Sequence, residues 1–184
     1  MTGANGFLGA TLVELLLGRG YSVIAAHRPA ARLHLLQEVA QRVGPQAAAR
    51  LRLAAADINA LGALERAVPD GVAALFHVAA AVSFERATEA QRRMVYRANV
   101  VGTRNVAAVC RQRRVGRLVH VSTEGVYFAA GREGVADERS EKAAARTNMA
   151  YLHTKLLAEY EVARAVVQDG LWAAIVQPGA IIGR

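Results

Sequence analysis

The stretch Thr2-Gly3-Ala4-Asn5-Gly6-Phe7-Leu8-Gly9 decides the fold of this chain, because its glycines recur at every third position directly before the apolar run 12–17. A glycine turn that enters a helix lets backbone N–H groups approach a pyrophosphate closely, and the helix N-terminus adds a favourable dipole. We expect Gly3 to form the tight turn, Gly6 to leave room for the phosphates, and Gly9 to let helix and sheet pack closely. A glycine-rich loop without a ligand is the alternative interpretation.

The strand that should precede such a turn is absent, since only Met1 stands before Thr2. In a doubly wound sheet this strand is the central one. We therefore expect that the numbering begins inside a longer natural chain, for example where an internal valine codon has been read as Met1. An in-frame stop codon just upstream, with no apolar run encoded there, would contradict this expectation.

Composition indicates one folded domain over residues 1–184, because 53% of the residues are hydrophobic and the mean hydropathy is +0.17. The apolar runs are shorter than the roughly 20 residues of a membrane span, so no membrane partner is expected. The N-terminus does not resemble a secretion signal. The single Cys110 excludes an internal disulfide and predicts a reducing, cytoplasmic location.

The net charge of +8 comes almost entirely from arginine, since Lys142 and Lys155 are the only lysines. The pair Arg92-Arg93 and the arginines between positions 111 and 117 resemble a nucleic-acid patch. However, no aromatic platform or nucleic-acid motif accompanies them, so solvated helix ends are the preferred interpretation. We expect no nucleic-acid partner.

Strand-like and helix-like segments alternate along the chain, which predicts a parallel α/β sheet. We expect strands over 22–26, 51–54, 73–78, 117–121 and 172–177, and helices over 7–19, about 30–42, 59 or 61–68, 88 to about 113, and 149–168, with a polar loop over 129–147. The predicted fold class is a doubly wound, Rossmann-type parallel sheet that is incomplete at both ends. Ligands of such sheets bind at the carboxyl ends of the strands, where Arg28, Asp57 and Ser122-Thr123 fall beside the Gly3 turn.

Tyr151 and Lys155 are four residues apart in a predicted helix and therefore share one of its faces. A phenol ordinarily ionises near pH ~10. A neighbouring ammonium and a cationic nicotinamide would favour the phenolate, which predicts proton exchange nearer neutral pH. The chemistry indicated is hydride transfer at a carbon that bears oxygen, with Thr123 holding that oxygen near the phenol. An accidental spacing on an amphipathic helix is the alternative.

The chain resembles the extended short-chain dehydrogenase/reductase family, which contains NAD(P)-dependent epimerases, dehydratases and dihydroflavonol-reductase-like enzymes. The resemblance covers essentially the whole sequence and rests on TGANGFLG from Thr2, ADI from Ala56, FHVAA from Phe76, NVVGTRNV from Asn99, VHVSTEGVY from Val119, YLHTK from Tyr151 and QPGAIIG from Gln177. Their order along the chain makes the set far more specific than any one motif.

The resemblance implies that Tyr151 is the catalytic acid/base and that Lys155 binds the nicotinamide ribose and tunes the phenol. It assigns the catalytic hydroxyl to Thr123, with Ser122 as the weaker alternative, and gives Asn99 a supporting role in the active-site helix and proton relay. The predicted cofactor-binding residues are Gly3, Asn5, Gly6, Phe7, Leu8, Gly9, Arg28, Asp57, Ile58, Ala79, Ala80, Tyr151, Lys155 and Pro178.

Several positions depart from the family pattern. Phe128 replaces a frequent glycine, Thr154 replaces a frequent serine, and Arg184 stands where proline is common. The first strand and the C-terminal substrate domain of the family are both missing from the sequence. We therefore expect a dinucleotide site but not a complete substrate pocket.

The second predicted strand runs into His27-Arg28 without the carboxylate that NAD-specific sites usually place there. Arg28 would suit a 2′-phosphate, so NADP(H) is favoured and NAD(H) is the alternative. A plain surface arginine before Pro29 is also compatible with the sequence.

The favoured function is a reductase of dihydroflavonol-reductase-like type that acts on a small carbonyl compound. A nucleotide-sugar epimerase or dehydratase and a non-catalytic dinucleotide-binding module are the alternatives, and a homodimer is possible. Glu124 is either a second acid/base or a solvated loop carboxylate. No metal site is expected, since the remaining histidines, at positions 34, 77, 120 and 153, lack metal-ligand spacing and are interpreted as strand-end or surface residues.

Overall fold

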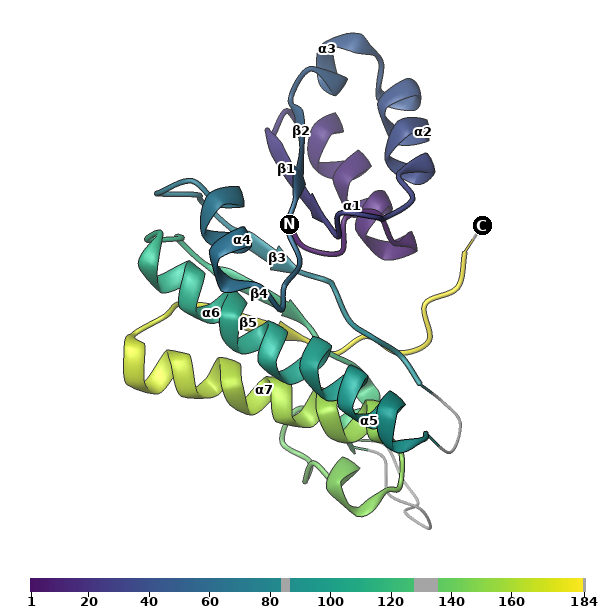
Figure 1. The fold of residues 1–184 in the computed structure, drawn as a ribbon, viewed down its shortest axis with the longest axis vertical. Coiled ribbons are helices and arrows are strands. Elements are labelled where there is room, and N and C mark those ends of the chain that lie inside the picture. The colour runs from purple at the N-terminus through teal and green to yellow at the C-terminus, as the bar shows by residue number, and fades with distance from the viewer. Residues whose placement is uncertain (84–86, 128–135, 184) are drawn as a thin grey trace.

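The computed structural model describes residues 1–83, 87–127 and 136–183. Within this part of the chain the strands, in order, are β1 (Val23–His27), β2 (Leu51–Ala55), β3 (Leu75–His77), β4 (Leu118–Val121) and β5 (Ala173–Val176). β1 pairs with β2, β4 lies between β3 and β5, and every pairing is parallel. With helices packed against these strands, the predicted Rossmann-type α/β fold is confirmed (Figure 1).

Two N-terminal residues connect the two groups of strands. Thr2 forms parallel bridges to both Ala26 and His77. Its N–H donates to the carbonyl of Phe76 at 2.9 Å, and the carbonyl of Met1 accepts from the N–H of Ala26 at 2.8 Å. Thr2 therefore lies where the sequence predicts the central strand, and the sheet is continuous there over a single residue.

One half of the molecule contains β1 and β2 with the helices α1 (Phe7–Gly18), α2 (His34–Val43) and α3 (Pro45–Ala48). α2 begins later than the predicted residue 30, because the N–H of Ala31 donates to the carbonyl of Arg28 at 3.0 Å in a turn that precedes the helix. Apolar side chains of α1, α2 and β1 form the core of this half: Val13, Leu17, Val23, Leu36 and Val39.

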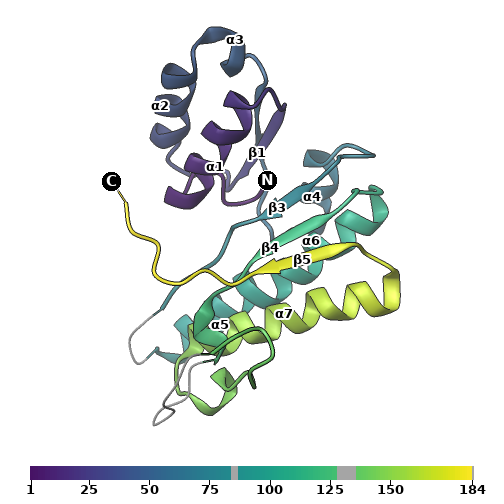
Figure 2. The same ribbon diagram turned by 180° about the vertical axis from the view of Figure 1, so that it is seen from behind.

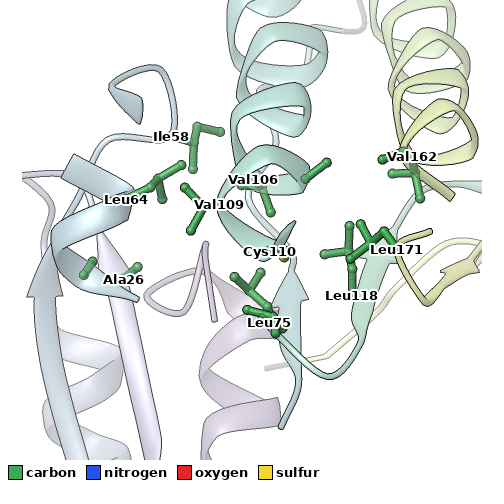
Figure 3. Close-up of a cluster of buried hydrophobic side chains, with 14 of the residues drawn as sticks. Ala26, Ile58, Leu64, Leu75, Val106, Val109, Cys110, Leu118, Val162 and Leu171 are labelled. Atoms are coloured by element: carbon green, nitrogen blue, oxygen red, sulfur yellow. The ribbon is translucent and has the colours of Figure 1, made fainter. Parts of the chain in front are cut away.

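The other half contains β3, β4 and β5 with the helices α4 (Leu61–Ala67), α5 (Glu89–Tyr96), α6 (Gly102–Gln112) and α7 (Ala150–Asp169). α6 and α7 lie side by side over one face of the three strands (Figure 1), and Figure 2 shows the opposite face, where no helix of the described residues covers them. The core between strands and helices is drawn in Figure 3 and includes Leu64, Leu75, Val106, Val109, Leu118, Val162 and Leu171. α7 ends at Gly170, whose φ of 65° is left-handed.

The helix predicted from Thr88 to about Arg113 is interrupted. A capping box between Thr88 and Gln91 starts α5, and a π-helical turn, η1 (Arg97–Val101), separates it from α6. π-Helical turns are uncommon and occur often at functional sites. This one carries Asn99 and thereby sets the direction of that side chain relative to α7.

Short 3₁₀ turns flank the polar segment before α7. They are η2 (Glu124–Tyr127) and η3 (Ala144–Arg146). η3 lies inside the stretch predicted as a loop over 129–147, and residues 129–135 of that stretch are outside the described residues. The atypical Phe128 and Arg184 also lie outside them. None of the described helices is both long and apolar enough to span a membrane.

Candidate active site

A large cleft runs along the carboxyl ends of the strands and crosses both halves of the molecule. It is lined by the glycine turn, by the residues that follow β1 to β5, and by one face of α7. Each predicted cofactor-binding residue lies on its wall: Gly3, Asn5, Gly6, Phe7, Leu8, Gly9, Arg28, Asp57, Ile58, Ala79, Ala80, Tyr151, Lys155 and Pro178. Thr123 also lines the cleft, whereas Asn99 lies behind it. The fold thus brings together residues that are more than 170 positions apart in the sequence.

The glycine turn is built by close backbone approaches. Gly3 has a φ of +69°, and a Cβ there would lie 2.5 Å from the backbone nitrogen of Ala79. A Cβ on Gly9 would lie 2.1 Å from the carbonyl oxygen of Gly3, so Gly9 packs against the turn itself rather than against a strand. Only the Gly3 oxygen, at 3.4 Å, would be near a Cβ on Gly6. The Gly6 position is thus the open one, as expected for the residue that faces phosphates.

The N-terminus of α1 opens into the same cleft. Gly6 is its N-cap residue, no side chain caps it, and its first turn contains no acidic residue. The first N–H groups of a helix lack intrahelical partners and attract anions. Gly6 and this helix end therefore form a site whose geometry and charge fit a phosphate group.

The ends of β1 and β2 form the far wall of the cleft. Arg28 is exposed, and its guanidinium makes no hydrogen bond or ion pair within the described residues. The carboxylate of Asp57 accepts from the backbone N–H of Asn59 at 2.8 Å. Ile58 is 9% exposed, and most of its side chain packs in the core against Gly102. Ile58 thus touches the cleft mainly by its edge.

Helix α7 presents Tyr151 and Lys155 to the cleft one turn apart, as predicted. Lys155 is 2% exposed, and its Nζ donates to the carbonyl of Val121 at 2.6 Å. Burial lowers the pKa of Lys155 to about 8, and the nearby charge of Glu159 opposes that lowering. Burial raises the pKa of Tyr151. The predicted lowering of the phenol pKa concerns the site with a nicotinamide bound and stays a prediction.

Thr123 and Ser122 differ in exposure. Thr123 is half-buried, lines the cleft and accepts a hydrogen bond from the N–H of Gly125 at 3.2 Å. Ser122 is 4% exposed, and its hydroxyl has no partner in the described residues. Glu124 lies nearby against Gly179. This arrangement favours Thr123 over Ser122 as the hydroxyl that meets a ligand.

Asn99 connects the segment that follows β3 to α7. Its Oδ1 accepts from the N–H of Ala81 at 2.8 Å, and its Nδ2 donates to the carbonyl of Ala81 at 2.9 Å and to Oγ1 of Thr154 at 3.0 Å. The hydroxyl of Thr154 in turn donates to the carbonyl of Tyr151 at 2.9 Å. The side chain that departs from the family serine is therefore part of the support of Tyr151. The position of Thr154 directly before Lys155 was the feature of the sequence that could have indicated this supporting role.

A second polar chain was missed by sequence reasoning. The hydroxyl of Thr103 donates to the carbonyl of Asn99 at 2.6 Å, so it accepts from Nε2–H of His77 at 3.0 Å. Nδ1 of His77 then accepts from the hydroxyl of Thr2 at 2.7 Å. These bonds link the residue before the glycine turn to the π-helical turn.

Of the two predicted alternatives, strand end or surface, the surface position is wrong for His77 and His120, and the strand-end position is confirmed for His77. His77 ends β3 and His120 lies within β4, yet both are 1% exposed and their rings lie 5.2 Å apart. Burial, together with the charge of Lys155, lowers the pKa of His77 to about 3 and that of His120 further. Both rings are thus neutral at physiological pH. Their burial follows the alternation of the two strands, in which Leu75 and His77 of β3 and Leu118 and His120 of β4 occupy the buried positions.

The arginines between positions 111 and 117 lie at the ends of α6 and β4. Arg113 and Arg114 pair with Asp70, Arg111 pairs with Asp169, and Arg117 lies over the ring of Trp172. No group of three or more His, Cys, Asp or Glu side chains suited to a metal ion occurs within the described residues.

Comparisons with known proteins agree with this geometry. The model of the NAD dependent epimerase/dehydratase family matches residues 1–184. The chain belongs to this family. Members are NAD-dependent oxidoreductases, epimerases and dehydratases.

The relatives of this chain include both reductases and a dehydratase. A ketoreductase from Stigmatella aurantiaca that acts on a farnesyl dihydroquinoline oxide is 37% identical over all of this chain and 50% of its own length. The dihydroflavonol 4-reductase of Dianthus caryophyllus is 29% identical over all of this chain and 51% of its own length. The structure of a dTDP-glucose 4,6-dehydratase from Streptomyces venezuelae, which contains NAD, is 29% identical, has a TM-score of 0.81, and matches 96% of this chain and 53% of that one. The chain thus spans about half the length of the relatives it matches.

Proposed function

We propose that this chain forms the dinucleotide-binding and catalytic part of an NAD(P)-dependent reductase of dihydroflavonol-reductase-like type. The observation that carries the proposal is that Tyr151 and Lys155 share one cleft with the Gly3–Gly9 turn. The similarity to a ketoreductase and to a dihydroflavonol reductase favours a carbonyl compound as substrate. Because the chain spans about half of these relatives, the activity belongs to the full-length protein.

Three residues of the cleft wall, and Asn99 behind it, have distinct tasks in this proposal. A bound nicotinamide cofactor would supply the hydride. The hydroxyl of Thr123 would orient the substrate oxygen, and the phenol of Tyr151 would donate the matching proton. The ammonium of Lys155 would hold the ribose and stabilise the phenolate that Tyr151 becomes. Asn99 would act through Thr154, by fixing the turn of α7 that carries Tyr151.

The preference proposed for the cofactor is NADP(H) over NAD(H). The end of β1 offers no carboxylate for ribose hydroxyls, and the exposed guanidinium of Arg28, which has no partner in the described part of the chain, suits a 2′-phosphate. The related dehydratase structure contains NAD, so NAD(H) is the alternative. Fluorescence titration of the full-length protein with NADPH and NADH separates the two: tighter binding of NADH would overturn the preference.

A second candidate function is a nucleotide-sugar epimerase or dehydratase. It is favoured by the similarity to the dTDP-glucose 4,6-dehydratase and by Glu124, a carboxylate on the cleft wall beside Thr123. A reductase consumes its cofactor with each turnover, whereas an epimerase regenerates it. Assays of NADPH oxidation with aldehydes and ketones, and of sugar conversion with nucleotide sugars, therefore distinguish the two. A dinucleotide-binding module without activity, the homodimer and the cytoplasmic location stay predictions.

The decisive test is the substitution Tyr151→Phe in the full-length protein. We expect turnover to fall about 10²- to 10⁴-fold, because the proton donor is lost, while the NADPH affinity changes little. Tyr160→Phe is the matched control, since Tyr160 lies on the outer face of α7 and is 55% exposed. Unchanged turnover in Tyr151→Phe would exclude Tyr151 as the acid/base.

A further inference from the structure

The catalytic helix buries a carboxylate that the proposed chemistry does not use. Glu159 lies one turn after Lys155 and two turns after Tyr151, so the three side chains form one row along α7. Glu159 is 1% exposed. Carboxylates are almost never buried to this degree unless they are paired, because their desolvation is costly. The position therefore needs an explanation beyond a solvated helix face.

The partners of Glu159 come from separate parts of the chain. The ammonium of Lys142, in the segment before α7, pairs with Oε2 of Glu159. Nε2 of Gln177, at the end of β5, donates to Oε1 at 2.8 Å. Oε1 of Gln177 accepts from the hydroxyl of Tyr127 in η2 at 2.8 Å. Both carboxylate oxygens are thus satisfied, and the network joins the segments that border the cleft behind Lys155.

The ammonium of Lys155 has fewer hydrogen-bond and ion-pair partners within the described residues than the carboxylate of Glu159 has. Its ammonium has three donors, and the hydrogen bond it makes within the described residues goes to Val121. The titratable groups that face it are His77 from β3, His120 from β4, and Tyr151 and Glu159 from α7 itself. The two histidines are neutral and the phenol is protonated at neutral pH, because burial disfavours their charged forms. Glu159 is the anion of this set.

We propose that Glu159 is a positioning residue for Lys155: its carboxylate stabilises the buried ammonium from the turn below. The catalytic meaning of this role rests on the proposed function. The expected effect of Glu159 on the charge of Lys155 does not rest on that function, because it concerns the protein without substrate or cofactor. Lys142 has the complementary task of stabilising the Glu159 carboxylate from the solvent side, where its own side chain is 31% exposed.

Two substitutions distinguish this electrostatic role from a purely structural one, in which Glu159 only holds neighbouring segments together. Glu159→Gln keeps the shape and an oxygen acceptor for Gln177 but removes the negative charge. We expect it to lower the pKa of Lys155 by roughly one unit, because an opposite charge one helical turn away is lost. Lys142→Met breaks the same ion pair yet leaves the carboxylate, so it should leave the pKa of Lys155 unchanged or raise it. A purely structural role of Glu159 predicts the same pKa of Lys155 in both variants.

The measurement is NMR of the full-length protein with ¹³C-labelled lysine, with Lys155 assigned by the substitution Lys155→Arg. An unchanged pKa of Lys155 in Glu159→Gln, or an equal fall in Lys142→Met, would overturn the proposal. If Glu159→Gln alone does not fold, the double variant Glu159→Gln/Lys142→Met removes both charges together. Loss of a whole buried ion pair is better tolerated than loss of one partner. The double variant should still show the lowered pKa of Lys155.

A second readout connects the charge to catalysis. The alkaline limb of the pH profile of kcat/KM, measured with NADPH and a ketone substrate, should move to lower pH in Glu159→Gln by the same amount as the Lys155 pKa. An alkaline limb that stays in place despite the lowered pKa would overturn the positioning role. A protein without reductase activity whose Lys155 responds as expected would instead contradict the proposed function and leave the electrostatic pairing intact.

Discussion

The two halves of the molecule hold their parts of the cleft by different means. In the half with β1 and β2, the turn before α1 is fixed by backbone contacts that only glycine permits. In the half with β3, β4 and β5, polar side chains beneath the cleft hold the residues of its wall in place. The buried polar residues of the described chain are Thr2, His77, Asn99, Thr103, His120, Ser122, Thr154, Lys155 and Glu159. All of them except Thr2, at the junction, belong to the second half.

Under the proposed function, this difference matches what each half would present to a ligand. A phosphate is bound by backbone N–H groups, which requires that side chains be absent. Proton transfer requires side-chain groups with defined orientation and charge, and these need partners when buried. We therefore expect the first half to be most sensitive to added atoms and the second half to lost polar atoms.

The largest effect is expected for Gly9→Ala. The new Cβ would lie 2.1 Å from the carbonyl oxygen of Gly3 and 2.8 Å from Cα of Ala4, both backbone atoms that a rotamer change cannot move. We expect a loss of about 4 kcal/mol in the free energy of unfolding, together with the loss of NADPH binding. Urea denaturation and fluorescence titration measure the two quantities.

Gly18→Ala provides the matched control on the same helix. A Cβ on Gly18 meets nothing within 4 Å. Alanine should stabilise this last residue of α1 by up to about 1 kcal/mol, because it restricts the unfolded chain. Equal changes in the free energy of unfolding for the two substitutions would show that the backbone contacts of Gly9 do not govern the stability of the first half.

The buried cation of the second half predicts a pH dependence of stability. Lys155 has a pKa of about 8 in the folded protein and an ordinary value of 10.5. Between these two pH values the unfolded state binds more protons than the folded state, so the stability conferred by this group rises with pH. The rise amounts to about 3 kcal/mol and is complete above pH 10.5, whereas below pH 8 the penalty of charging the buried amine is constant.

Lys155→Met isolates this contribution. The free energy of unfolding of the parent protein, minus that of the variant, should increase between pH 8 and 10.5. The subtraction removes other groups that titrate there, such as Cys110, whose pKa burial raises to about 12. A flat difference over this range would mean that Lys155 is solvated in the folded protein.

The sequence predicted the first half better than the second. Strand ends, the glycine turn and its relation to the cleft follow from local patterns, because backbone rules act over short distances. The parallel sheet and the shared cleft of Tyr151 and the glycine turn followed from the alternation of strands and helices and from the family motifs, whereas the order of the strands was not predicted. The start of α2 was misplaced, because the turn between Arg28 and Ala31 has no strong sequence signature.

The π-helical turn and the buried polar contacts that hold the second half together could largely not be predicted from the sequence. Nothing in the run from Thr88 to Arg113 marks a π-helical turn, since one displaced hydrogen bond creates it without a glycine or proline in the turn. The polar chain from Thr2 to Asn99 and the pair between Lys142 and Glu159 join residues whose distance in sequence hides their contact. A lone histidine in a strand pattern does not reveal that it is buried. Such partners emerge only from packing.

The smallest effect tests the second half by removing one hydroxyl. Thr154→Val keeps the size of the side chain but removes the acceptor for Nδ2 of Asn99 and the donor to the carbonyl of Tyr151. We expect a loss of about 1.5 kcal/mol in the free energy of unfolding, because buried polar groups lose partners, and a much smaller loss for Thr154→Ser. Thr11→Val is the matched control in the first half, since the exposed hydroxyl of Thr11 donates to the carbonyl of Phe7 on the surface of α1. Urea denaturation of the three variants decides the point: if Thr11→Val and Thr154→Val lose equal stability, the hydroxyl beneath Tyr151 contributes no more than a surface one. The two halves would then not differ in the way their buried side chains indicate.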